Sequence, residues 1–515
     1  MEAMTKAGAR PSAIAVRSCN DRRPPSRPDR PSPIHDRRLM HLFAVTCLAA
    51  ATSAIGAASV AAQRPSLSAA ARQFVRADTS LVALTNVRVI DGTGAPARDG
   101  QTIVVRDGRI VALGDASDVK PPEGALVMDL TGKSVIPGLV MVHEHLFYPT
   151  GPAVYGNLSE SFTRLYLAGG VTSMRTGGNM NGLGEIGIAK AIAAAQKAGP
   201  WIDATAPYLQ GPGLAGIGQM HVLKDAADAR RMVTYWADEG ATSYKAYMHI
   251  TRAELRAAVD EAHRRGLRVT GHLCSVTYRE AAELGIDDLE HGFLASTDFA
   301  PHKQPDECPA QETSSISHVD VDSEPFKALV AELVKRRVAV TSTLTVFETF
   351  AVGRPEPPGL DVLVEPLRQQ FLQFRANLER ATTPSPFGAL LKKDMAMELA
   401  FARAGGLLIA GTDPTGAGGV VPGYSNQRQL ELLVEAGFTP LEAIRIGTLN
   451  GATYLRRDSL VGSIAVGKQA DLVVINGEPS RQISDVRNVE LVFKQGIAYD
   501  PAKLIASVKG KVGLF

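Results

Sequence analysis

The strongest constraint on the fold begins at Pro137, where apolar runs of strand length start to alternate with amphipathic stretches of helix length. Helical periodicity appears at 160–167, 253–265, 278–284, 326–335 and 396–404, and strand-like runs lie at 139–146, 170–174, 240–248, 267–272, 287–291, 338–344 and 407–413. Such alternation indicates a parallel sheet, because each crossover helix returns the chain to the same edge of the sheet. At this length we predict an α/β fold, a (β/α)8 TIM barrel over residues 137–455. The aperiodic segment 298–324 is predicted to be a long loop and a candidate lid.

The residues on either side of the barrel have a different pattern, in which short runs of alternating apolar and polar residues are separated by tight turns. On the N-terminal side, 101–105 and 109–113 flank Asp107-Gly108, a strong hairpin signal. On the C-terminal side, 470–475 and 489–493 are of the same kind. We therefore predict one small β-sandwich domain from both chain ends, with 63–136 as its N-terminal part and 456–515 as its C-terminal part.

Residues 1–62 are predicted to be an N-terminal extension and signal peptide. Two arginines precede Met40, an Ala-rich apolar stretch follows it, and Val60-Ala61-Ala62 forms a small-x-small cleavage site. Met1 and Met40 are both candidate starts, because 1–39 is rich in Pro and Arg. An uncleaved anchor is the competing interpretation, since about 20 apolar residues can span a bilayer. Cleavage predicts a periplasmic or secreted protein with no stable membrane insertion afterwards.

The net charge of +2 conceals an uneven distribution. Residues 1–39 hold nine Lys and Arg against four Asp and Glu, whereas from Gln63 onward 46 basic residues face 49 acidic ones. A body this close to neutral gives no reason to expect binding to nucleic acid or to a membrane surface. We expect a small-molecule substrate instead.

Two of the four cysteines, Cys274 and Cys308, lie beyond the predicted cleavage site. An oxidising compartment permits a disulfide between them. Buried free thiols are the competing interpretation, and the sequence leaves both open.

The run Leu139-Val-Met-Val-His143-Glu-His145 is apolar and ends in two histidines one residue apart. Side chains i and i+2 of a strand point to the same side, so both imidazoles face one spot while Glu144 points away. Two histidines in this register, after a buried type of strand, suggest metal ligands. Short histidine motifs have a high false-positive rate, so the rest of the chain must decide.

Further residues with ligand or acid–base chemistry stand at the ends of later predicted strands: Lys245, His272, His291 and Asp413. Taken singly, they have ordinary explanations as a surface lysine, core histidines and an aspartate that begins a turn. In a barrel, however, the C-terminal ends of the strands converge on one face, where active sites are built. Together with the histidine pair they predict one six-residue site on strands one, four, five, six and eight.

With these residues in view, the sequence resembles the metal-dependent amidohydrolase superfamily over nearly all of the mature chain. The motifs that carry the resemblance are Asp91-Gly-Thr-Gly94, Pro137-Gly-Leu-Val-Met-Val-His143-Glu-His145, Gly170-Val-Thr-Ser-Met-Arg175, Asp288-Leu-Glu-His291-Gly292, Gly411-Thr-Asp413, Thr439-Pro-Leu-Glu-Ala-Ile444 and Gly462-Ser-Ile-Ala-Val-Gly-Lys-Gln-Ala-Asp-Leu472. The short spacing from His272 to His291 resembles the imidazolonepropionase-like branch, which includes Xaa-Pro and other dipeptide-cleaving carboxypeptidases.

Other branches and two local departures set limits on the resemblance. Hydantoinases and dihydroorotases also carry the strand-four lysine, but their corresponding histidines lie much further apart, so they rank second. Val142 stands where the family usually has Asp or a similar polar residue, which removes a common partner of the ligands. Arg175-Thr176 stands where the branch often has Arg-Asp, which puts the substrate contacts of that branch in doubt.

The resemblance implies a binuclear centre in which Lys245 is carbamylated by CO2, because the resulting anion can bridge two metal ions. Zn²⁺ is the expected metal, with Mn²⁺, Ni²⁺ and Co²⁺ as alternatives. A metal-bridged hydroxide would attack the substrate carbonyl, and Asp413 would carry the proton to the leaving amine as the catalytic residue. The more buried ion would be held by His143, His145 and Asp413, and the other by His272 and His291.

We therefore expect an exported hydrolase of an amide C–N bond, acting on dipeptides or N-acyl amino acids. The alternative is a hydrolase or deaminase of cyclic amides, lactones or amidines, which differs only in pocket shape. A mononuclear deaminase would lack the strand-four lysine, and a metal-free binding protein would be expected to lose ligands. The superfamily often forms homo-oligomers, and the sequence sets no number.

Three further polar residues, Arg175, His221 and Tyr247, are expected near the substrate. Arg175 or Tyr247 would hold a carboxylate terminus, since a guanidinium recognises a carboxylate in a bidentate way. A structural arginine, a loop histidine and a core tyrosine are the ordinary alternatives, because only a few polar groups in a pocket set specificity.

Overall fold

The computed structural model describes residues 65–151, 154–213, 218–310 and 314–515. These residues belong to one compact unit, Arg64–Phe515. The predicted extension and signal peptide and both candidate starts lie outside the described residues. Across the described ranges, no helix combines the length and the apolar character needed to cross a bilayer.

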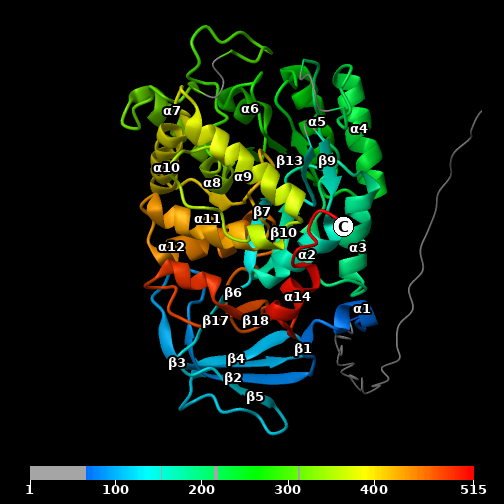
Figure 1. Ribbon diagram of the computed structural model, residues 1–515, viewed down its shortest axis with the longest axis vertical. Helices are drawn as coiled ribbons and strands as arrows, with labels where there is room; N and C mark the ends of the chain where they lie inside the picture. Colours follow the sequence, from blue (N-terminus) through cyan, green and yellow to red (C-terminus); the bar gives the residue numbers. More distant parts are fainter. Residues whose placement is uncertain (1–64, 152–153, 214–217, 311–313) are drawn as a thin grey trace, which may run out of the picture. The chain divides into compact units, whose positions relative to one another are not determined.

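Eight parallel strands form the centre of the unit, as the alternating pattern predicts (Figure 1). One sheet of three holds β7 (Leu139–Glu144), β10 (Val171–Thr176) and β11 (Trp201–Asp203), and a sheet of five holds β12 (Ser243–Ala246), β13 (Arg268–Gly271), β14 (Asp288–Glu290), β15 (Ala339–Ser342) and β16 (Leu408–Ala410). A parallel bridge between Thr205 and Ser243 links the two sheets. Beside the first strand, the backbone N–H groups of Thr412 and Asp413 donate to the carbonyl of His143 at 3.0 and 3.1 Å. The arrangement is a TIM-barrel-like α/β fold.

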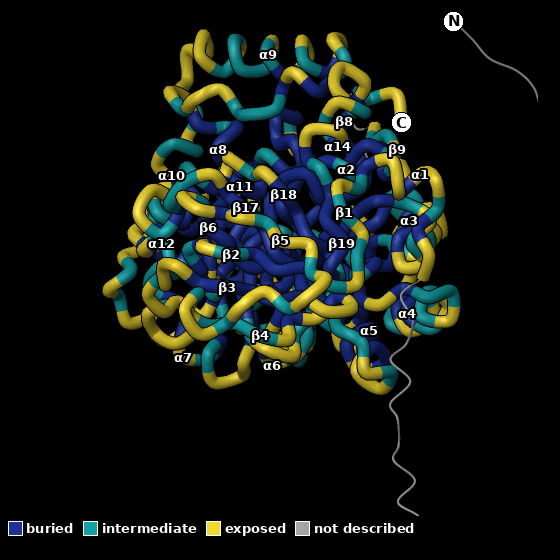
Figure 2. Tube along the Cα trace, turned by 90° about the horizontal axis from the view of Figure 1, so that it is seen from below, coloured by how far each residue is buried: buried dark blue, intermediate teal, exposed yellow. Residues whose placement is uncertain are grey.

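Helices surround these strands, and burial falls from the strands outward to the helix surfaces (Figure 2). They are α2 (Ser159–Ala168), α3 (Leu183–Ala193), α4 (Ala226–Glu239), α5 (Arg252–Arg264), α6 (Tyr278–Leu284), α7 (Glu324–Arg336), α8 (Leu344–Glu348), α9 (Glu365–Arg380), α10 (Phe387–Arg403), α11 (Tyr424–Glu435), α12 (Pro440–Arg445) and α13 (Gly451–Tyr454). Local chemistry explains where they begin. In α5, for example, the Thr251 side chain accepts from the N–H of Glu254, whose carboxylate accepts in return, and this capping box satisfies donors that a helix start leaves unpaired.

The apolar faces of strands and helices share one continuous core. Val269, Leu289 and Val340 face outward from neighbouring strands and belong to the same buried cluster as Leu255 of α5 and Leu329 of α7. Because successive side chains of a strand alternate in direction, the intervening residues of these strands face the interior. This alternation directs the polar residues of the strand ends towards one another.

Strands from both chain ends pair in a second sheet, as predicted. Its members are β1 (Val75–Ala77), β2 (Leu81–Val89), β3 (Arg98–Arg106), β4 (Arg109–Asp115), β5 (Leu126–Asp129), β6 (Ser134–Pro137), β17 (Leu472–Ile475), β18 (Val489–Lys494) and β19 (Ile497–Tyr499). The two chain ends meet where β17 pairs antiparallel with β6. The predicted hairpin is confirmed, since Asp107 and Gly108 take φ values of 48° and 80° between β3 and β4. All nine strands pair into one sheet, and the two-layered sandwich and the domain bounds stay predictions.

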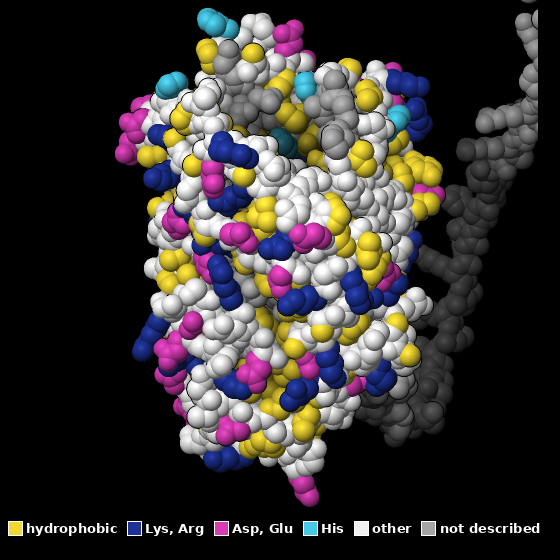
Figure 3. Space-filling view, viewed as in Figure 1, with side chains coloured by type: hydrophobic (Ala, Val, Ile, Leu, Met, Phe, Trp, Pro, Cys, Tyr) yellow, Lys and Arg dark blue, Asp and Glu magenta, His cyan; other side chains and the backbone are white. Residues whose placement is uncertain are grey.

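Smaller elements complete the unit. These are α1 (Ala69–Arg72), the paired strands β8 (Phe147–Gly151) and β9 (Val154–Asn157), α14 (Pro501–Val508), and short 3₁₀ or π segments at Leu360–Val362, Ile446–Asn450 and Ile483–Arg487. On the face shown in Figure 3, basic and acidic side chains are intermingled rather than gathered by sign.

The predicted long loop connects β14 to α7, and the Cys274–Cys308 disulfide fastens it. Of the two interpretations left open for these cysteines, the structure therefore shows the pair. Asp306 adds an ion pair with Arg252 at 3.1 Å, and the Lys303 ammonium donates to the carbonyl of Ser275 at 2.6 Å. Around Cys308 the loop is thus held against the segment that follows β13, and a lid function stays a prediction.

Candidate active site

The six residues predicted as one site lie on, or just beyond, the C-terminal ends of five strands. The chain supplies them from β7 (His143 and, one residue beyond, His145), β12 (Lys245), β13 (His272), β14 (His291) and β16 (Asp413). In the order of the eight parallel strands these are the first, fourth, fifth, sixth and eighth. Most of these side chains are buried, and Asp413 is 7% exposed.

The six side chains approach one another closely. His145 Nε2 lies 3.1 Å from Asp413 Oδ1, and Lys245 Nζ lies 3.3 Å from His143 Nε2. The ring of His291 is 4.7 Å from that of His143 and 4.3 Å from that of His272, measured between centroids. Residues as far apart as 143 and 413 in sequence therefore share one small volume.

This group fits divalent metal ions by its chemistry and its geometry. His143, His291 and Asp413 each offer a ligand atom, and these atoms lie within 4.8 Å of one another. Imidazole and carboxylate are the ligands that Zn²⁺ prefers, and a buried group of this kind without an ion would leave polar atoms poorly satisfied. Indeed, Nδ1 of His143 and Nδ1 of His145 are buried without a hydrogen-bond partner.

The electrostatics of the site favour the forms that bind metal. Burial lowers the pKa of His143 and of His272 well below the usual range, and the nearby Lys245 ammonium adds to both effects. The same causes lower the pKa of His291 to about 4. Burial alone would raise the pKa of Asp413, but the hydrogen bond from His145 and the electrostatic interactions with His145, His291 and Lys245 hold it below its usual range. Neutral imidazoles and an ionised carboxylate are the states that coordinate a cation.

The backbone at two of the six site residues departs from the strand conformation. His291 and Asp413 take φ values of 71° and 53°, which are uncommon for residues other than glycine. At His291 this turn lets the imidazole face the site although the preceding Glu290 also faces the interior. Such conformations persist where the surrounding structure imposes them, and they are frequent at functional sites.

Two glycines make room for His143. A Cβ on Gly177 would lie 2.4 Å from the His143 ring, and one on Gly411 would lie 2.3 Å from the His143 Cβ. Both distances are too short for real carbon atoms. The Gly-Thr-Asp motif therefore helps to position His143 as well as supplying Asp413.

Glu290 is a buried member of the site that was not predicted. Its carboxylate forms an ion pair with Lys245, accepts from Thr270 Oγ1 at 2.6 Å and from Arg175 Nη1 at 3.1 Å, and has an oxygen 3.5 Å from His143 Nδ1. Burial opposes ionisation, but Lys245 and Arg175 lower the pKa of Glu290 below its ordinary value. Its position directly before His291 on the same strand was the signal that could have found it.

Arg175 is not at the substrate cavity, contrary to expectation. The side chain is 1% exposed and lies beneath the site, where its guanidinium donates to Glu290, Thr270 and Ser243 and to backbone carbonyls. These hydrogen bonds engage the guanidinium nitrogens that were expected to bind the carboxylate of a substrate. Arg175 instead stabilises the buried charge of Glu290.

The cavity beside the six residues has a volume of about 200 Å³ and a mostly aromatic wall. Of the other two predicted substrate residues, Tyr247 lines it, whereas His221 does not and forms a 3.3 Å contact with Asp228 Oδ2. Glu144 contacts Thr412 and Asn426 and, as expected, lies outside this lining. The wall residues that sequence reasoning missed are Phe147, Tyr155, Met180, Tyr208, Met220, Val346, Phe347, Phe350, Thr415 and Gly416. Most stand on loops and short elements, where no periodicity marks them.

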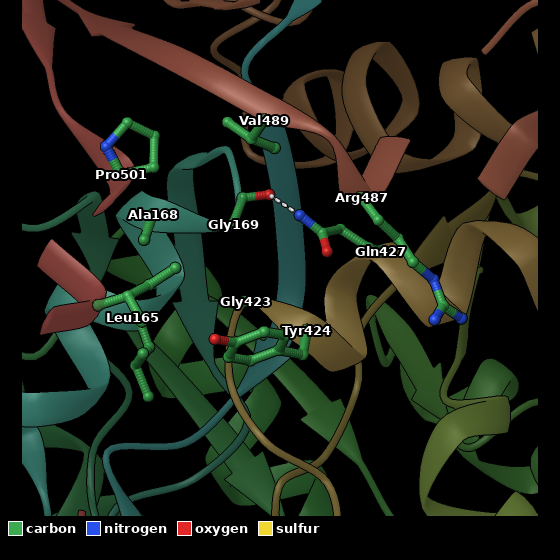
Figure 4. A pocket seen from close by; sticks show the side chains of 10 residues that line it. Leu165, Ala168, Gly169, Gly423, Tyr424, Gln427, Arg487, Val489 and Pro501 are labelled. Atoms are coloured by element: carbon green, nitrogen blue, oxygen red, sulfur yellow. Dashed lines mark hydrogen bonds between the residues drawn. The ribbon is translucent and has the colours of Figure 1, made fainter. Parts of the chain in front are cut away.

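A separate small cavity lies between α2, α11 and the C-terminal strands (Figure 4). Its volume is about 60 Å³, and its wall includes Leu165, Tyr424 and Gln427, whose amide donates to the carbonyl of Gly169 at 3.3 Å. None of the six site residues lines it. This cavity is too small for the chemistry described above, and its lining lacks the residues that the chemistry requires.

Known proteins resemble this chain in sequence and in fold. The model of the Amidohydrolase family matches residues 382–499. An imidazolonepropionase from Herpetosiphon aurantiacus is 24% identical over 453 residues, covering 80% of this chain and 96% of the relative. A solved prolidase-like protein from Bifidobacterium longum is 25% identical with a TM-score of 0.62, covering 83% of this chain and 99% of that one. A solved Xaa-Pro dipeptidase with bound methionine has the same fold, with 20% identity, a TM-score of 0.62, and coverage of 82% and 100%.

Fold and site together define a TIM-barrel-like hydrolase with histidines, a lysine and an aspartate at the strand ends. The chain is similar to amidohydrolases, and this similarity supports a hydrolase that acts on carbon–nitrogen bonds.

Proposed function

We propose that this enzyme is an exported, binuclear metal-dependent hydrolase of an amide bond in small molecules, with dipeptides or N-acyl amino acids as substrates. The observation that carries the proposal is the meeting of six residues with ligand chemistry at one group of strand ends. A barrel closed between β16 and β7 would keep them together, and the hydrogen bonds from Thr412 and Asp413 to His143 support this closure.

The chain offers ligands for two ions. His143, His145 and Asp413 would hold the more buried one, His272 and His291 the other, and a carbamate formed from Lys245 and CO2 would join them. When bound, divalent ions supply Lewis-acid activation of a carbonyl and of water. The ligand types favour Zn²⁺.

Asp413 is the residue best placed to move a proton. Its Oδ1 lies beside His145 Nε2 and accepts from Thr415 Oγ1 at 2.7 Å, and the carboxylate faces the cavity. Its lowered pKa keeps it ionised at neutral pH, so it can accept a proton from the attacking water. It then delivers that proton to the nitrogen of the leaving amine as the C–N bond breaks.

The cavity wall favours hydrolysis of a compact, largely apolar substrate. Phe147, Tyr208 and Phe347 line this cavity and would keep bulk water away from the reacting bond. Lys245 is the one Lys or Arg in this lining among the described residues, and it faces the ligands. Tyr247 is therefore the proposed contact for a carboxylate terminus, in place of Arg175.

Export is supported by the disulfide, because such bonds persist in oxidising compartments. We propose a periplasmic or secreted location, reached through cleavage of the predicted signal peptide.

A hydrolase or deaminase of cyclic amides is the second candidate function. Its support is the relative named imidazolonepropionase, which this chain matches over 96% of that protein's length. The same metal-binding residues would serve either reaction.

A substrate screen separates the two. We would purify the metal-replete mature protein and test dipeptides, N-acyl amino acids, cyclic amides and lactones by chromatography of the products. Release of a free amino acid from linear amides supports the first function. Turnover confined to cyclic compounds would replace it with the second, and no turnover of any C–N bond would contradict both.

A further inference from the structure

A second cavity adjoins the one that is lined by five of the six site residues. It has a volume of about 180 Å³, and both cavities are lined by His272 and Phe347. His272 is one of the proposed metal ligands, so the second cavity begins where the chemistry takes place. A group attached to the scissile bond could therefore extend into it.

The wall of this second cavity is apolar. Besides His272 and Phe347, the described residues that line it are Met248, Leu273, Cys274, Leu294, Ala295 and Phe387, and none of these carries a charged side chain. The Phe347 and Phe387 rings are nearly parallel, with 9° between their planes and 6.1 Å between centroids. Cys274 takes part in the disulfide, so it presents no free thiol to a ligand.

The wall is also held in place from the outside. Leu294 and Ala295 stand on the connection after β14, and the disulfide ties that connection to the segment after β13. Thr297 Oγ1 donates to the carbonyl of Cys274 at 3.0 Å. These links hold the wall in place, and a preformed site avoids the loss of freedom that ordering a wall would require.

We propose that this cavity is a specificity subsite that receives one apolar group of about the size of a phenyl ring, joined to the bond that is cleaved. An apolar cavity of about 150 Å³ can hold benzene, so a volume of about 180 Å³ is sufficient. A charged group would enter without a partner and is disfavoured for that reason. The inference rests on the proposed function and narrows its substrates to amides that carry an aromatic or large aliphatic side chain.

The first test uses kinetics with matched substrates. N-acetylglycine is compared with N-acetyl-L-phenylalanine and with N-phenylacetylglycine, which place the ring on either side of the amide. We expect kcat/KM to be at least about tenfold higher for one of the two aromatic compounds, since filling an apolar pocket gives gains of this size. The Ala295→Phe variant fills the subsite and should reduce this ratio towards one, whereas the exposed Ala404→Phe should leave it unchanged. Equal rates for all three compounds, or an unchanged ratio in A295F, would overturn the proposal.

A second variant covers the case in which A295F fails to fold. Phe387→Ala enlarges the cavity, so the preference should move from the phenyl compound to its naphthyl counterpart. A preference that stays with the phenyl compound in a folded, metal-containing F387A protein speaks against the subsite.

The second test does not depend on turnover. Toluene has no hydrolysable bond, and its position in crystals of the metal-loaded protein shows directly whether the cavity accepts a ring. We expect toluene next to Phe347 and Phe387 in the wild type and in A404F, and its loss in A295F. If no amide is hydrolysed but toluene binds in the cavity, the proposed function is contradicted and the apolar binding site is supported. If toluene is absent from the cavity, the subsite itself is refuted.

Discussion

Asp413 is the residue that we propose for both metal binding and proton transfer. It contacts His145, lies 3.9 Å from both His143 Nε2 and His291 Nδ1, and belongs to the cavity wall. A side chain with both tasks cannot be replaced by a neutral isostere without loss, because an amide neither takes up the proton nor balances the charge of an ion.

The Asp413→Asn variant is expected to fold and to lose turnover. We expect kcat to fall by about 100- to 10,000-fold, the usual contribution of general acid–base catalysis. Circular dichroism checks the fold, and steady-state kinetics on the best substrate from the screen checks the rate. Wild-type activity in D413N would refute the proton-transfer role.

Substitution of Lys245 tests directly whether a carbamate forms at this residue. Lys245→Ala would remove the proposed bridging carbamate, so the metal content per chain should fall and activity should drop at least about 100-fold. A short carboxylic acid added in solution should restore part of the activity, because it can occupy the space of the lost carbamate. Elemental analysis gives the metal content, and the exposed Lys392→Ala serves as the matched control. Unchanged metal and activity in K245A would exclude the carbamate.

At the scale of elements, strand ends are shaped by glycines as much as by ligands. Gly411 follows β16 and packs against His143 on β7, with its missing Cβ only 2.7 Å from the His143 backbone nitrogen. Backbone atoms cannot move aside as a flexible side chain does, so an added methyl group must displace the strand.

We expect Gly411→Ala to lose metal affinity and activity together while the protein stays folded. Gly187→Ala is the matched control, because a Cβ at that position in α3 meets nothing within 4 Å. Metal titration followed by calorimetry measures the affinity. An affinity in G411A equal to that of G187A would show that the position of His143 tolerates the change.

The first turn of α3 contains a buried carboxyl that makes stability depend on pH. Burial raises the pKa of Glu185 to about 8, although Asn181 donates to its Oε1 at 3.1 Å. The folded state therefore keeps a proton at pH values where the unfolded chain has already lost it. The stability that the protonated Glu185 carboxyl contributes to the folded state is complete below pH 4.5. It is lost as the pH rises through about 8.

Glu185→Gln should remove this dependence, because the amide does not ionise. Relative to the wild type, the variant should gain on the order of 4 kcal/mol at most between pH 5 and pH 9. Thermal unfolding at both pH values measures the difference, with the exposed Glu283→Gln as control. A Tm difference between E185Q and wild type that does not grow with pH would contradict the assignment.

At the scale of the whole molecule, the proposed metal ligands come from five strands. An ion held by β7, β14 and β16 would bind only to the folded state, so it would stabilise that state by mass action. We expect close to two divalent ions per chain after metal-replete expression. At a free metal concentration 100 times the Kd, the stabilisation is about 2.7 kcal/mol.

Chelation should consequently lower the Tm and abolish activity, and added Zn²⁺ should restore both. Elemental analysis before and after dialysis gives the stoichiometry, and a chelator presaturated with metal is the control. If the protein contains no metal after metal-replete expression, the proposed metal-dependent mechanism is contradicted.

Much of the architecture could be read from local patterns. The alternation after Pro137 predicts eight parallel strands, and the Asp107-Gly108 turn predicts the hairpin between β3 and β4. These features follow from side-chain periodicity and turn chemistry, which act over a few residues. The pairing of strands from both chain ends was predicted because it was the simplest arrangement. In the structure, the antiparallel pairing of β6 with β17 joins the two ends in one sheet.

The sequence by itself determined which residues carry ligand chemistry, because strand ends of a parallel fold converge and their side chains alternate in a known way. Only the tertiary structure decided the surroundings of that centre. It turned Arg175 inward to Glu290, left His221 beside Asp228, and paired Cys274 with Cys308. The walls of both cavities come from loops and short helices such as those bearing Tyr208, Phe347 and Phe387, which no common pattern links. Their proximity results from packing between segments far apart in the chain, and packing of that kind has no local signature.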